Sequence, residues 1–257
     1  MNAFLAAAFC AATAVTLEAQ TGFWSQHADL GLNYEDGAWD LHVHHHALGE
    51  FEPGEAILGV DIAAALRAVP AGTPWSFLGA AGSPVWILPQ THDDNLLFLG
   101  LGTEELAAGL FAGDQVTLAL KAVNGPGSFA LYRTDAFGTP TVFMNSGDGI
   151  AAEDAVTLPA GSHSHVNWAF SAPGAYHIDF EGAGTLAEGN VFTSSGPVTY
   201  TFQVAAVPEP ATLALAALGA LSLIWQTRRR HGPSRNVEDA AREEASPPEG
   251  TEGARSG

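Results

Sequence analysis

The sequence predicts an all-β fold, an antiparallel β-sandwich with minor helices, and three observations lead to it. Apolar and polar residues alternate along several segments, which is typical of strands with one buried face. The 257 residues include 29 Gly and 15 Pro, which separate these segments as turns do. Apolar residues make up 47% of the chain and charged residues 14%, so a sizeable core can be buried. A β-barrel is the second architecture that this pattern allows.

The alternating segments locate the strands, and the turns between them predict which strands are neighbours. The turn Asn124-Gly125-Pro126-Gly127 predicts one hairpin and Pro173-Gly174 predicts another. Short helices are expected near residues 62–69 and 104–111. Strands are expected at residues 30–34, 39–43, 116–120, 129–131, 166–170, 176–180 and 200–204. The residues expected to form the core are Trp39, Leu41, Leu118, Trp168, Phe170, Tyr176, Ile178 and Phe202.

The charge of the chain excludes one class of partner and favours another. Its 9 Lys and Arg face 28 Asp and Glu, which gives a net charge of −19. Between residues 20 and 206 the basic residues are Arg67, Lys121 and Arg133 alone. A nucleic-acid binder needs clustered basic charge to neutralise phosphates, so we expect no nucleic-acid partner. The acidic body should instead attract cations.

The N-terminal residues predict export. Residues 3–17 form an Ala-rich apolar run, and Ala19 offers a small residue for cleavage, so residues 1–19 are interpreted as a signal peptide. The alternative is a buried first helix of the domain. Cys10, the single cysteine, lies in this run. The body at residues 20–206 therefore has no disulfide and no Cys-based metal site.

The C-terminal residues carry a more specific signal, at residues 207–230. It consists of the triplet Pro208, Glu209 and Pro210, an apolar run, and the cluster Arg228, Arg229 and Arg230. These elements in this order resemble the PEP-CTERM sorting signal of Gram-negative bacteria. The resemblance implies an exosortase-type partner, a transmembrane helix at residues 207–227, and a location at the inner membrane, the cell surface or the extracellular matrix. A plain membrane anchor is the alternative, and residues 231–257 read as a disordered polar tail.

Histidines fall on strand faces that point away from the expected core. On the strand at residues 39–46, His42 and His44 lie opposite the apolar face, and on the strand at residues 163–170 His163 and His165 do so. His27 and Asp29 form a third pair with the same spacing, and an expected loop carries His92-Asp93-Asp94. Imidazole suits zinc and other divalent transition metals, so these pairs are candidate metal ligands. The alternative is a solvated face whose charge changes with pH.

The body also resembles a family. The segment from Gly161 to Tyr176 contains H-x-H before N-W-x-F, a Pro-Gly turn and a tyrosine, and it resembles the closing motif of the actinobacterial surface-anchored repeat domain. The segment His27-Ala28-Asp29-Leu30 resembles the first strand of that domain. Residues 27–204 resemble the choice-of-anchor M proteins as a whole. The resemblance implies a surface-displayed β domain, and some relatives are encoded beside metal-type ABC transporters, which favours metal-uptake machinery as a partner.

The sequence offers little catalytic chemistry. Ser162 and His163 are adjacent, so on a strand they point to opposite faces and cannot pair. The chain has no G-x-S-x-G nucleophile elbow. We therefore expect a protein that is not an enzyme and has no catalytic residues. If no metal binds, the alternative function is adhesion or contact with exopolysaccharide through exposed aromatic and acidic side chains.

Overall fold

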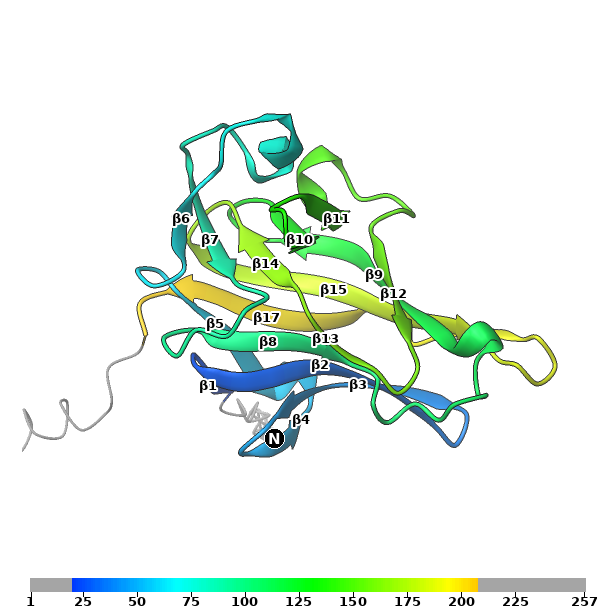
Figure 1. Cartoon of the computed structure of the whole chain (residues 1–257). Coiled ribbons are helices and arrows are strands. Elements are labelled where there is room, and N and C mark those ends of the chain that lie inside the picture. Colours follow the sequence, from blue (N-terminus) through cyan, green and yellow to red (C-terminus); the bar gives the residue numbers. More distant parts are fainter. Residues whose placement is uncertain (1–19, 208–257) are drawn as a thin grey trace, which may run out of the picture. The chain divides into compact units, whose positions relative to one another are not determined.

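The computed structural model describes residues 20–207 and shows a chain built from three β-sheets (Figure 1). The described helices are short 3-10 turns: η1 (Pro53–Glu55), η2 (Thr73–Leu78), η3 (Ala112–Asp114) and η4 (Ser146–Asp148). The all-β prediction is therefore confirmed. The predicted signal peptide at residues 1–19, the sorting segment from Pro208 onward and the polar tail lie outside the described residues.

The largest sheet, sheet A, has seven strands, and sheets B and C have five each. Sheet A contains, in spatial order, β1 (Thr21–Phe23), β5 (Ala56–Asp61), β17 (Val198–Ala205), β15 (Gly174–Thr185), β9 (Gln115–Asn124) and β12 (Ala155–Pro159), with β16 (Phe192–Ser194) beside β15. Sheet B contains β13 (His163–His165), β8 (Leu97–Gly102), β2 (Gln26–Glu35), β3 (Ala38–His45) and β4 (Gly49–Phe51). Sheet C contains β11 (Pro140–Asn145), β10 (Phe129–Thr134), β14 (Asn167–Phe170), β7 (Pro84–Leu88) and β6 (Leu66–Ala68).

The sheets are mixed, which corrects the expectation of a purely antiparallel fold. β5 runs parallel to both β1 and β17, and β2 runs parallel to β8. Parallel neighbours need long connections, because the chain must return to the same end of the sheet. Here the chain between β2 and β8 makes strands of all three sheets before it returns to sheet B.

The two predicted hairpins at Asn124-Gly125-Pro126-Gly127 and Pro173-Gly174 are wrong. The first turn connects β9 of sheet A to β10 of sheet C, and the second connects β14 of sheet C to β15 of sheet A. At each turn the chain thus passes from one sheet to another instead of folding back within one sheet. Alternation cannot separate the two cases, because both leave one face of each strand buried.

The core lies where the sheets meet and is rich in aromatic rings. Trp168 of sheet C packs against Phe202 of sheet A, with ring centroids 5.6 Å apart. The Trp168 indole N–H donates to the backbone carbonyl of Leu99 in sheet B at 3.1 Å, so one side chain contacts three sheets. All but one of the predicted core residues are buried, and Trp39 is half-buried.

The short helices predicted near residues 62–69 and 104–111 are absent from the described structure. Residues 62–69 form a turn followed by β6, and the Asp61 carboxylate accepts from the backbone N–H groups of Ala63 and Ala64. Residues 104–111 form turns that bury Leu106 and Phe111. Successive turns can space apolar residues as a helix does, which explains the error. Among residues 20–207, no helix has the length and hydropathy needed to cross a membrane.

Candidate metal centre

The candidate site lies on the face of sheet B that points away from the core. In β2 the residues Ala28, Leu30 and Leu32 are buried among apolar neighbours. Strand alternation sends His27, Asp29 and Gly31 to the other face. The same alternation in β13 places His163 and His165 on that outer face. The outward direction expected for His163 and His165 agrees with the structure, but the single strand expected at residues 163–170 is divided into β13 of sheet B and β14 of sheet C.

Strand register brings β2 and β13 together across β8. Asp29 of β2 is paired with Gly100 of β8, and Gly100 is paired with His165 of β13. A Cβ atom on Gly100 would lie against Asp29 Oδ1, 2.9 Å from His163 Nε2 and 3.1 Å from His165 Cε1. The missing side chain at Gly100 therefore leaves the space in which side chains from the two flanking strands meet.

Four potential ligand side chains converge in this space, and we call them the His3Asp group. His27, Asp29, His163 and His165 each offer one ligand atom, and these atoms all lie within 4.8 Å of one another. The shortest contact joins His163 Nε2 to Asp29 Oδ1 at 2.6 Å, where a protonated ring nitrogen donates to the carboxylate. The His27 and His165 rings lie 5.0 Å apart, and the His163 and His165 rings 4.7 Å apart, between centroids.

The group is buried on one side and open on the other. The Asp29 side chain is 10% exposed, whereas the side chains of His27 and His163 are 30% and 27% exposed. The Phe98 ring stacks on the His165 ring with centroids 3.6 Å apart and an interplanar angle of 10°. Phe98 therefore holds the His165 ring in one plane, while the open side gives an ion access from solvent.

Two ring nitrogens of the group are buried without a hydrogen-bond partner. They are Nε2 of His27 and Nδ1 of His165. His27 Nε2 lies 3.3 Å from Asp29 Oδ1, but in no hydrogen-bonding geometry. Buried polar atoms are normally paired, and a cation bound by the His3Asp group would pair these nitrogens.

The surroundings favour the neutral, metal-binding form of His165. Burial, reinforced by the neighbouring His163 and His27 rings, lowers the pKa of His165 to about 4, although Asp29 acts in the opposite direction. A metal ligand must be unprotonated, so His165 is ready to coordinate over most of the pH scale. Three imidazoles and one carboxylate are a donor set that zinc accepts in tetrahedral geometry, at about 2.0–2.2 Å per bond.

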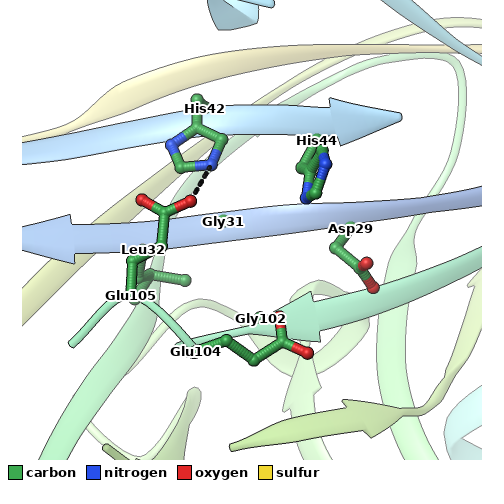
Figure 2. A pocket seen from close by; sticks show the side chains of 8 residues that line it. All are labelled: Asp29, Gly31, Leu32, His42, His44, Gly102, Glu104 and Glu105. Carbon is green, nitrogen blue, oxygen red and sulfur yellow. Dashed lines mark ion pairs between the residues drawn. The ribbon is translucent and has the colours of Figure 1, made fainter. Parts of the chain in front are cut away.

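His42 and His44 lie on the same outer face but outside the His3Asp group. They line a small pocket together with Asp29, Gly31, Leu32, Gly102, Glu104 and Glu105 (Figure 2). His42 comes close to Glu50 and Glu105, with one ligand atom of each within 4.8 Å of the others. The six candidate ligands of the sequence analysis thus divide between two places. The pair His92 and Asp94 lies 3.7 Å apart between Nε2 and Oδ1, on an exposed loop.

Sequence reasoning missed Glu50 and Glu105. Glu50 of β4 is paired with His44 of β3. Gly49 follows the histidine-bearing strand closely and is a turn signal, so it could have predicted that the chain folds back and places Glu50 beside this strand. Glu105 lies in the turn after β8, and β8 is far from His42 in the sequence. Its approach depends on the β2 and β8 pairing, which no local pattern contains.

Comparison with known proteins identifies one segment of the chain. The PEP-CTERM protein-sorting motif matches residues 206–230, where Pro208, Glu209, Pro210 and the three arginines lie. No curated protein and no solved structure matches the chain. The fold and the site thus define an all-β domain with a histidine-rich sheet face. The motif indicates that this domain is exported to the envelope or surface of a Gram-negative bacterium.

Proposed function

We propose that the chain is a non-enzymatic, surface-sorted β domain that binds one divalent transition metal, with zinc preferred, through His27, Asp29, His163 and His165. One observation carries the proposal: two strands of sheet B, β2 and β13, bring three imidazoles and a buried carboxylate within 4.8 Å of one another. Gly100, between these strands, leaves open the space that a Cβ atom would fill.

The donor chemistry supports zinc over calcium or magnesium. Calcium and magnesium prefer oxygen ligands, whereas imidazole nitrogen suits zinc, copper, iron and nickel. The Asp29 carboxylate offsets part of the charge of a divalent ion. The net charge of −19 raises the local concentration of cations around the whole chain.

The sorting motif supports the cellular part of the proposal. We infer that an exosortase-type enzyme processes the chain. Residues 207–227 anchor it in the inner membrane, and the body either stays there or is released to the surface or matrix. The resemblance to choice-of-anchor M proteins supports the same placement for the body. It also favours delivery of the bound ion to metal-uptake machinery.

A second function, contact with exopolysaccharide, is favoured by a different region. Trp75 and Phe77 stack at an interplanar angle of 24° on η2, beside Tyr132 of sheet C. A polar cleft beside Phe77 is lined by Asn145 and Asp148. Aromatic rings next to polar side chains are a common way to hold a sugar, and this surface needs no metal.

Calorimetry of the full chain in detergent micelles, stripped with a chelator, separates the two functions. We expect zinc to bind with an affinity well below a millimolar dissociation constant. The double variant His163→Ala, His165→Ala should weaken zinc binding by about 100-fold or more, since even outer partners of a ligand contribute roughly 10- to 100-fold. The control His177→Ala removes an exposed histidine from sheet A. Zinc binding that the double variant leaves unchanged would favour the adhesion function.

A further inference from the structure

A second group of potential ligands lies on the outer face of sheet B, and we call it the His42 group. It consists of His42 on β3, Glu50 on β4 and Glu105 in the turn after β8. One atom of each lies within 4.8 Å of the others. His42 Nε2 is 3.9 Å from Glu105 Oε1, the contact drawn as a dashed line in Figure 2.

His42 itself is buried although it faces away from the core. It is 5% exposed, and its Nδ1 atom is buried without a hydrogen-bond partner. The ring lies over Gly31, where a Cβ atom would come within 2.6 Å of His42 Cε1. Gly31 thus allows the imidazole to lie down on the sheet and to point into the pocket rather than into solvent.

The pocket in front of His42 adds further negative charge. Figure 2 shows the Glu104 and Asp29 carboxylates on the other side of the pocket from the His42 ring. The Asp40 carboxylate approaches His42 from behind, with Oδ2 3.5 Å from Nδ1. The Glu50 and Glu105 carboxylates each offer one oxygen, and these lie within 4.8 Å of each other, so they repel one another unless a cation lies between them. A cation bound between the buried imidazole and the carboxylates around it would therefore be stabilised by both.

We propose that His42, Glu50 and Glu105 bind a second divalent cation that is harder than zinc, of the manganese class. One nitrogen and two carboxylates make an oxygen-rich donor set, and carboxylates suit manganese, magnesium and calcium. The single imidazole favours manganese over the other two. This site goes beyond the zinc site proposed above and stands on separate residues. The rival explanation is a protonated His42 that forms ion pairs with Asp40 and Glu105 and binds no metal.

Manganese binding is best measured in a background that lacks the first site. The full chain with His163→Ala and His165→Ala, stripped with a chelator in detergent micelles, is titrated with Mn²⁺ while electron paramagnetic resonance follows the free ion. We expect one Mn²⁺ per chain. Glu105→Gln in this background should weaken binding by about tenfold or more, because a direct ligand is lost. Glu105 is exposed, so this variant should fold, and His42→Ala is a second test.

Glu104→Gln is the matched control, because it removes the same charge from the same pocket without removing a proposed ligand. Its effect on Mn²⁺ binding should be clearly smaller than that of Glu105→Gln. Absence of Mn²⁺ binding in the background variant would overturn the second site, and so would equal effects of the two glutamate variants. A failure of zinc binding in the unaltered chain would refute the first site alone and leave this measurement unaffected.

Discussion

The His3Asp group and the His42 group lie on one face of sheet B, but the fold fixes their ligands in different ways. Asp29, His163 and His165 sit on strands whose hydrogen-bonded register is set across β8. In the His42 group only His42 lies within a long paired strand, while Glu50 and Glu105 are exposed and one of them lies in a turn. Register can thus hold ligands in place before an ion arrives, whereas turn residues must be ordered by the ion itself. We expect the first group to bind more tightly and more selectively.

Filling the space above Gly100 should produce the largest loss. The variant Gly100→Ala places a methyl group against the Asp29 carboxylate and 2.9 Å from His163 Nε2. Zinc affinity should fall by about 100-fold, because the ligands can no longer converge. The control Gly102→Ala puts its methyl group 3.1 Å from the flexible Glu104 carboxylate instead. Calorimetry should find near-normal zinc binding there, and equal losses in both variants would contradict a role for Gly100.

Exchange of one carboxylate in each group tests whether the two groups are separate. Asp29→Asn keeps the shape of the side chain but removes its charge, and zinc affinity should fall by roughly 10- to 100-fold. Glu105→Gln should change zinc affinity by no more than about threefold, through the lost long-range attraction. Competition against a fluorescent zinc chelator measures both. A large effect of Glu105→Gln would show that the two groups form one site.

The pH dependence of the metal-free chain should show the cost of burying His165. Its pKa is about 4 when folded and 6.5 when exposed, so the unfolded chain binds more protons between these values. Stability should therefore rise as the pH increases from about 4 to 6.5 and should lose this contribution as the pH falls. Urea unfolding at several pH values measures the slope. His165→Asn should flatten it, and an unchanged slope would mean that His165 does not titrate as proposed.

Sheet C offers the opposite titration, with the smallest expected effect. Burial raises the pKa of Tyr132 to about 12, above the ordinary value of 10.0. The unfolded chain then loses this proton first, so stability should decrease as the pH rises from about 10 to 12. Tyr132→Phe keeps the ring that packs against Phe77 at 5.1 Å between centroids. Thermal unfolding measured at several pH values around pH 10.5 should show that stability decreases less steeply with rising pH in this variant than in the unaltered chain.

The sequence was informative about faces and uninformative about neighbours. Alternation placed His42, His44, His163 and His165 opposite the core, because successive strand residues must point to opposite sides. It could not show that β2 and β13 flank β8, since these two pairings bring together residues far apart in the sequence, such as Asp29 and His163 with a separation of 134. The same limit explains the two wrong hairpins, where a local turn crosses between sheets.

The ligands of the His42 group were predictable only in part. The pattern on β3 located His42, but a period of two says nothing of whether an outward side chain stays in solvent. His42 is buried because Gly31, on the neighbouring strand, provides no side chain to lift the ring. Glu105 reaches it from a turn that the sequence pattern had assigned to a helix.

The long separation between Asp29 and His163 gives the His3Asp group a consequence for folding. An ion bound there would act as a cross-link that closes a loop of 134 residues. In a covalent cross-link, a loop of about 100 residues reduces the entropy of the unfolded chain by an amount worth about 4.7 kcal/mol. The described body contains no cysteine, so it cannot use a disulfide for this purpose. A metal staple of this kind would be indifferent to oxidants and reductants outside the cell, yet it would open when acid or a competing chelator removed the ion.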